Sequence, residues 1–159
     1  MNPELITVGI LGSDLPGLRP VLRVDEGDRV SVGDALFHDK VDTKICVFSL
    51  VAGRVRKIQK GAARTLTAIS IDEVDSSESV LADINSTIPQ NREALISLLL
   101  ASGLWTRLRQ RPFGAVPLTH IRPKKLFISA ADSGPGAVIP HELTDQEMAA
   151  LKVGLQAFC

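Results

Sequence analysis

The chain has 159 residues, which suits one domain or two small ones. Apolar residues make up 45% of it, charged residues 23%, and 18 basic side chains balance 18 acidic ones. A chain without net charge is not built to attract a polyanion, so we expect no nucleic-acid partner. No apolar run approaches the roughly 18 residues of a membrane-spanning helix, and the N-terminus lacks a secretory signal pattern.

The first 75 residues consist of short apolar, β-branched segments separated by turn residues. Strands are predicted within residues 5–12, 21–24, 52–58 and 66–72. Two Gly-Asp turns, at Gly27-Asp28 and Gly33-Asp34, are each followed two places later by an apolar residue. Glycine supplies the positive φ of such turns, and aspartate can close them through its side chain. The sequence therefore predicts a domain of short strands joined by tight turns.

The same segment resembles a known type of β-sandwich. The pattern EGDxVxxGDxL begins at Glu26, and AGxVxxI begins at Ala52. Together they resemble the lipoyl/biotinyl domains, in which a hairpin lysine carries a prosthetic group. Lys40 and Lys44 are the candidates here, but Lys40 follows Gly33 three residues too early and Lys44 lies too close to Gly53. We therefore expect unmodified surface lysines and no covalently bound cofactor.

Residues 72–86 are acidic and rich in serine, which predicts a linker. A helix is predicted next, beginning near Pro89 with Glu93 in its first turn. Its buried stripe would be Leu95, Leu98 and Leu99, and Gly103 occupies the position of a C-terminal cap.

The segment after this helix carries the densest positive charge of the chain. Between Trp105 and Lys125 there are six cationic residues and one histidine, without any acid. An extended conformation would place one aromatic and three arginine side chains on the same side, where they could stack on and hydrogen-bond a flat or anionic partner. Alternatively, the arginines pair with acids elsewhere in the chain or on a neighbouring protein of an assembly. The candidate site for such a flat or anionic partner comprises Trp105, Arg107, Arg109, Arg111 and Phe113.

The C-terminal part has the pattern of the start of an α/β domain. A strand is predicted over residues 124–131, and Thr144 to Glu147 form a capping box for a helix whose core face is Met148, Leu151, Leu155 and Phe158. Gly134-x-Gly136 after the strand lacks the third glycine of a dinucleotide-binding motif. One strand and one helix cannot form a covered layer. We therefore expect a longer polypeptide, or else a partner that completes the layer.

No catalytic or metal-binding residues are predicted. The three histidines are scattered, and neither a nucleophile elbow nor a metalloprotease motif accompanies them. Cys46 and Cys159 lie far apart and outside any metal-ligand spacing, which is typical of reduced thiols in the cytoplasm.

A second resemblance covers more of the chain. Gly103-Leu104-Trp105-Thr106, followed by Arg109-x-Arg111-Pro112-Phe113, resembles the A-subunit family of the sodium-translocating NADH:quinone reductases. Glu26-Gly27-Asp28 and Leu36-Phe37-x-Asp39-Lys40 also match that family, whereas residues 42–45 and 49–51 depart from its Pro- and Gly-rich pattern.

The resemblance implies an α+β protein with an unmodified lipoyl-like β-sandwich (barrel-sandwich hybrid) over residues 1–75, a linker, helix and basic connector over 76–123, and the start of an α/β domain over 124–159. It also implies a protein without a redox centre that binds quinone as substrate, while NADH and flavins belong to partner subunits. Such a protein would lie peripherally on the cytoplasmic face of the inner membrane, attached only through its partners. A carrier domain, or a structural assembly module related to the C-subunit of the Rnf complexes, remains the alternative.

Overall fold

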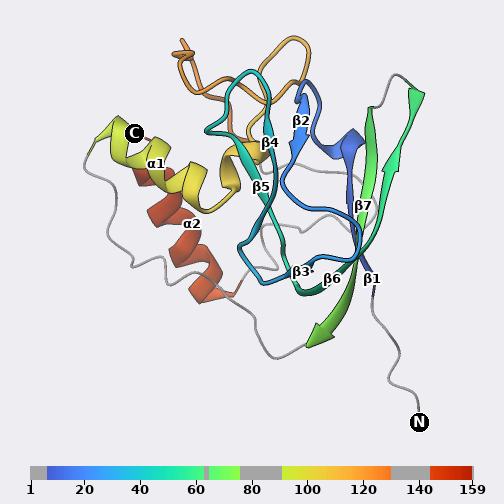
Figure 1. Cartoon of the computed structure of the whole chain (residues 1–159). Coiled ribbons are helices and arrows are strands. Elements are labelled where there is room, and N and C mark those ends of the chain that lie inside the picture. The colour runs from blue at the N-terminus through green and yellow to red at the C-terminus, as the bar shows by residue number, and fades with distance from the viewer. Residues whose placement is uncertain (1–6, 63–64, 76–90, 130–143, 159) are drawn as a thin grey trace.

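The computed structural model of the chain describes residues 7–62, 65–75, 91–129 and 144–158. Two antiparallel sheets face each other in its N-terminal part (Figure 1). One sheet has the strand order β1-β7-β6-β3 and the other β2-β4-β5. The strands are β1 (Thr7–Leu11), β2 (Pro20–Leu22), β3 (Arg29–Val30), β4 (Ala35–Asp39), β5 (Cys46–Phe48), β6 (Ala52–Lys60) and β7 (Leu66–Asp75).

The space between the sheets is filled by apolar side chains from both of them. Leu36 and Phe37 of β4 are almost fully buried, and they pack with residues of β5, β6 and β7. Burying side chains of this size is worth roughly 1.5 to 3 kcal/mol each. The core comprises Val30, Leu36, Phe37, Val47, Val55, Leu66, Ile69 and Ile71. The predicted β-sandwich is confirmed, and its core draws only on the first 75 residues.

The two Gly-Asp turns adopt the predicted conformation. Gly27 and Gly33 have φ values of 95° and 87°, which favour glycine over any residue with a Cβ atom. The Asp28 carboxylate accepts a hydrogen bond from the Asp25 backbone N–H at 2.8 Å, and Asp34 accepts one from Ser31 at 2.7 Å. These turns fix where β3 begins and ends, and so bring it against β6.

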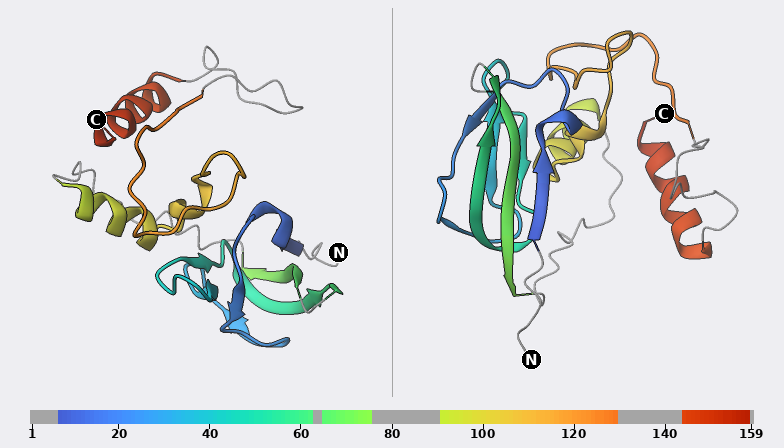
Figure 2. Two further views of the ribbon diagram at one scale, coloured as in Figure 1. Left: turned by 90° about the horizontal axis from the view of Figure 1, so that it is seen from above. Right: turned by 90° about the vertical axis from the view of Figure 1, so that its right-hand side faces the viewer.

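Helix α1 (Arg92–Ala101) lies beside the sandwich next to β5 (Figure 1, Figure 2). The predicted start near Pro89 was wrong, because Asn91 has extended backbone angles and caps the helix by accepting a hydrogen bond from Ala94 N–H at 2.8 Å; Pro89 itself lies outside the described residues. Gly103 adopts the predicted left-handed conformation, with φ of 73°, directly after the C-cap Ser102. The helix therefore ends where its sequence predicts.

The segment that follows is extended only after its first turn, at Leu108 and Gln110. Residues Leu104–Arg107 form a single turn of 3-10 helix, η3, and the chain then passes over the end of the sandwich (Figure 1). We call residues 104–125 the connector. Its hydrogen bonds to the β domain, described below, hold it in this path.

Helix α2 (Asp145–Ala157) begins with the predicted capping box at Thr144 and lies farther from the sandwich (Figure 2). The strand predicted over residues 124–131 is not observed in its described part, residues 124–129, which are irregular; residues 130 and 131 lie outside the described chain. A strand needs a neighbour to pair with its backbone groups. No such neighbour lies among the described residues, so Leu126, Phe127 and Ile128 remain exposed.

Candidate functional site

Trp105 lies in the core between the connector and the sandwich. Its side chain is only 6% exposed and packs in a second apolar cluster with Ile45 and Val116. The indole Nε1 donates a hydrogen bond to the Pro117 carbonyl oxygen at 2.8 Å, so its polar atom is satisfied within the chain. The exposed stacking surface predicted for Trp105 is therefore not observed: the 3-10 turn rotates the indole inward, away from the neighbouring arginines.

Arg109 also turns toward the chain. Its guanidinium donates hydrogen bonds to the carbonyl oxygens of Thr106 and Leu108, and it reaches Asp14 in the first loop with a bond of 2.8 Å. A guanidinium that caps three carbonyls fixes the path of the backbone. Arg109 thus links the connector to the β domain, and much of its donor capacity is already used.

The remaining three residues of the predicted site face solvent. Arg107 and Arg111 are exposed, and neither forms an ion pair within the part of the chain that the structure describes. Phe113 is 90% exposed. It occupies the tip of a tight loop closed by two backbone hydrogen bonds of Gln110, whose N–H donates to the Ala115 carbonyl oxygen at 2.7 Å and whose carbonyl oxygen accepts from Gly114 N–H at 2.9 Å. The structure therefore divides the predicted site: Trp105 and Arg109 hold the connector in place, while Arg107, Arg111 and Phe113 are open to a partner.

Two aspartates shape the adjoining turn between β4 and β5. Asp39 is 1% exposed, and its carboxylate accepts backbone hydrogen bonds from Arg19, Val41 and Asp42 at 2.6 to 3.0 Å. Asp42 accepts hydrogen bonds from Thr119, through both N–H at 2.8 Å and Oγ1 at 2.6 Å. The turn is thus ordered internally by Asp39 and bound to the connector by Asp42.

The contact between Asp42 and Thr119 affects the charge state of the carboxyl group. Partial burial alone raises the pKa of Asp42, but the hydrogen bonds from Thr119 and Lys44 N–H and the charge of Lys44 lower it more, so the net pKa lies below its ordinary value. Sequence reasoning missed this pair. The Asx-turn pattern Asp42-Thr43-Lys44 signalled the turn, but its distant partner at position 119 had no local signal.

The same turn carries the two lysines considered for covalent modification. Lys40 and Lys44 are both exposed, but Asp42 between them is bound to the connector. A carrier domain must present its lysine on a turn that can enter other active sites. Here a second segment of the chain binds the turn through Thr119, an arrangement that disfavours the carrier alternative.

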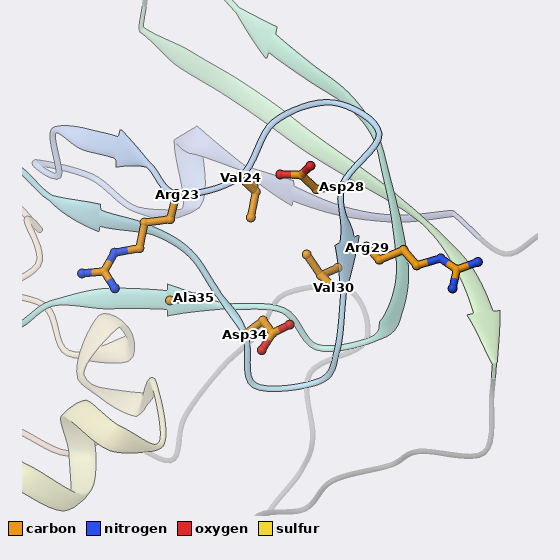
Figure 3. A pocket seen from close by; sticks show the side chains of 7 residues that line it. All are labelled: Arg23, Val24, Asp28, Arg29, Val30, Asp34 and Ala35. Carbon is orange, nitrogen blue, oxygen red and sulfur yellow. The ribbon is translucent and has the colours of Figure 1, made fainter.

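Two hollows open elsewhere on the described surface. The larger, about 430 Å³, lies beside the two Gly-Asp turns, and Figure 3 shows Arg23 and Arg29 pointing away from each other at its edges. It is lined by Arg23, Val24, Asp28, Arg29, Val30, Asp34 and Ala35. The smaller, about 330 Å³, is apolar and lies between residues 126–128 and α2. Neither hollow is lined by Arg107, Arg111 or Phe113, so these residues form an open surface and not the wall of either cavity.

The described residues contain no group of three or more potential metal ligands, and none of their helices is long and apolar enough to cross a membrane. The ion pair between Arg56 and Asp72 is the only one among them, and it lies on β6 and β7. The cations of the connector are therefore not neutralised by partners within the described chain.

Fold and site together define a class of protein: a barrel-sandwich hybrid whose hairpin turn is closed by a connector leading toward a second domain. Comparison with family models agrees. Residues 2–74 match the NqrA N-terminal barrel-sandwich hybrid domain, and residues 90–159 match the NqrA second alpha/beta domain. The chain belongs to the NqrA family over these two domains.

Curated relatives carry the corresponding name. The chain is 36% identical over 156 residues to the Na(+)-translocating NADH-quinone reductase A-subunit of Saccharophagus degradans and 37% identical over 158 residues to that of Klebsiella pneumoniae. These alignments include 97% and 96% of this chain, and 35% of each relative. The chain thus spans about a third of the length of the curated relatives it matches. The predicted family and fold class are confirmed.

Proposed function

We propose that this chain acts as part of the docking subunit of a sodium-translocating NADH:quinone reductase and that its connector offers the binding surface. In this proposal the chain holds no redox centre; NADH and flavins belong to partner subunits, and quinone is the substrate. The chain would lie peripherally at the cytoplasmic face of the inner membrane. Support comes from the name of its relatives together with the open cationic surface at the connector.

The observation that carries the proposal is that the residues of the predicted site fall into two groups, one bound within the chain and one open to solvent. Trp105 and Arg109 fix the connector to the sandwich, and Arg107, Arg111 and Phe113 face solvent from it. A quinone presents two carbonyl acceptors on a flat ring. Guanidinium donors and an exposed aromatic face are complementary to that chemistry.

The test is a calorimetric titration of the chain with a short-chain, water-soluble benzoquinone. Arg107→Ala, Arg111→Ala and Phe113→Ala should each weaken binding about tenfold, which corresponds to one lost contact of about 1.4 kcal/mol. Arg29→Ala is the matched control, because Arg29 is an exposed arginine on β3 that lies outside the connector, at the edge of the hollow in Figure 3. Trp105→Ala is unsuitable, since it would disrupt the second apolar cluster.

If the three connector variants bind the quinone as tightly as the unsubstituted chain, the quinone site does not lie on the connector. A structural assembly role is then favoured, in which the connector binds only a neighbouring protein of the complex. The internal use of Trp105 and Arg109 is the observation that gives this second function its weight.

A further inference from the structure

Positive charge collects at one end of the molecule. Figure 1 shows the connector and the β4–β5 turn together beyond the ends of the strands, at the end of the sandwich opposite β3, and the hydrogen bonds between Asp42 and Thr119 join the two segments. We call the exposed lysines and arginines of these segments the cationic end, leaving out Arg109, whose guanidinium binds carbonyl oxygens within the chain. It comprises Lys40, Lys44, Arg107, Arg111, Arg122, Lys124 and Lys125.

Within the described residues no acidic group forms an ion pair with this end, although the charge of Lys44 acts on Asp42. The carboxylate of Asp39 is buried and satisfied by three backbone N–H groups, and that of Asp42 is used by Thr119 and the Lys44 N–H. Asp14 meets Arg109 only through its backbone carbonyl. The sequence has no acid between Glu93 and Asp132. The cationic end therefore presents a surplus of positive charge to whatever lies against it.

Apolar side chains project at the tips of the two loops that form this surface. Phe113 is 90% exposed at the tip of the connector loop, next to Arg111, and Val41 is 58% exposed in the β4–β5 turn, next to Lys40. Both loops are held by internal hydrogen bonds, at Gln110 and at Asp39, so each tip is presented on a defined backbone. An exposed aromatic ring on a hydrogen-bonded loop, with cations nearby, suits a surface that inserts shallowly among lipid headgroups.

We propose that the cationic end binds directly to an anionic phospholipid surface, with Phe113 inserted among the headgroups and the lysines and arginines on the phosphates. An acidic polypeptide would also satisfy the charge, but it would need a pocket that fits the protruding phenyl ring, whereas a lipid interface accommodates an aromatic ring without one. The inference rests on the proposed function in one respect only, that the connector is an open docking surface. It adds a membrane contact made by this chain itself.

The first experiment is co-sedimentation of the 159-residue chain with quinone-free vesicles of phosphatidylcholine containing about one third phosphatidylglycerol. Binding should be lost in pure phosphatidylcholine and at about 1 M salt, where the Debye length is about 3 Å. Arg111→Glu and Lys124→Glu should each weaken the partition coefficient about thirtyfold, because two unit charges change. Phe113→Ser should weaken it about tenfold.

Matched controls lie at the opposite end of the sandwich. Arg29→Glu reverses an exposed charge on β3, and Leu50→Ser removes an apolar side chain that is 68% exposed beside the turn of Gly33. Both should leave vesicle binding unchanged. Equal losses in the controls would overturn the proposal, as would binding that survives Phe113→Ser, because a surface recognising any acidic partner would behave in that way.

A second measurement locates the inserted residue. In Phe113→Trp, brominated lipids should quench the added indole, whereas the unsubstituted chain, whose buried Trp105 is its only tryptophan, should not be quenched. Because the vesicles contain no quinone, failure here leaves the quinone titration unaffected. Absence of binding to anionic vesicles, or absence of quenching in the bound variant, would overturn the membrane contact alone.

Discussion

Asp42 is the single residue that most directly couples the β domain to the connector. Replacing it with alanine removes the acceptor for two Thr119 donors and for Lys44 N–H. We expect Asp42→Ala to lower the free energy of unfolding by about 1 to 2 kcal/mol, a range that allows for partial solvent screening of the carboxylate. Urea unfolding measures this loss. Thr119→Val should lower the free energy of unfolding by a similar amount, and the double variant should lose no more than either single variant.

The same pair gives a pH dependence whose sign follows from the lowered pKa. The folded-state pKa of Asp42 lies below its ordinary value, so its stabilising effect is fully present above that ordinary value and is lost as pH falls through the lowered one. The melting temperatures of the unsubstituted chain and of Asp42→Ala should therefore differ at neutral pH and converge in acid. A gap that widens on acidification would contradict this assignment.

Trp105 illustrates why individual site residues could not all be located from the sequence. The spacing of Trp105, Arg107, Arg109 and Arg111 is compatible with one face of an extended chain, but the left-handed Gly103 leads into a 3-10 turn that places the indole inside. The indole packs against Ile45 and donates a hydrogen bond to the Pro117 carbonyl oxygen. No local sequence pattern indicates either contact. Sequence identified the segment correctly but could not give the direction of each side chain.

At the level of secondary structure, Gly103 determines the direction in which the backbone leaves α1 and enters the connector. Its φ of 73° disfavours any Cβ atom, and a Cβ there would lie 3.1 Å from Cδ2 of Phe48 on β5. Gly103→Ala should therefore lower the free energy of unfolding by about 1 to 2 kcal/mol.

Gly114 provides the matched control for this substitution. It has a similar φ of 69°, but a Cβ at this position would meet no atom within 4 Å. Gly114→Ala therefore measures only the cost in free energy of unfolding of placing a residue with a Cβ atom at positive φ. If Gly103→Ala proves no more destabilising than Gly114→Ala in urea unfolding, the contact with Phe48 does not limit the position.

The elements that the sequence predicted well are those with local signals. Gly27, Gly33 and Gly103 required a positive φ, and the capping box at Thr144 shows reciprocal bonds to Glu147. The hydrogen bonds from Thr144 lower the pKa of Glu147, as expected for a carboxylate at a helix N-terminus. Residues 124–129 failed as a strand because pairing depends on a partner, which a local pattern of apolar residues does not supply.

Across the whole chain, the two apolar clusters differ in how far their members lie apart in sequence. The first draws on residues 30–71 and lies between the two sheets, so the alternation of short strands was enough to predict it. The second joins Ile45 of the β domain to Trp105 and Val116 of the connector. The β domain therefore has a core of its own, and the connector adds stability to a fold that does not depend on it.

This arrangement predicts the behaviour of a shortened chain of residues 1–75. It should still unfold cooperatively, because the first cluster is intact, but with a free energy of unfolding about 2 to 4 kcal/mol lower, since Ile45 becomes exposed and Asp42 loses Thr119. Ile45→Ala supplies the decisive comparison. In the 159-residue chain, where Ile45 is fully buried, it should cost about 2 to 5 kcal/mol; in the shortened chain it should cost less than about 1 kcal/mol, because no packed partner is lost. Equal costs in the two chains, measured by urea unfolding, would mean that Ile45 is buried by the β domain itself and that the connector contributes little to its stability.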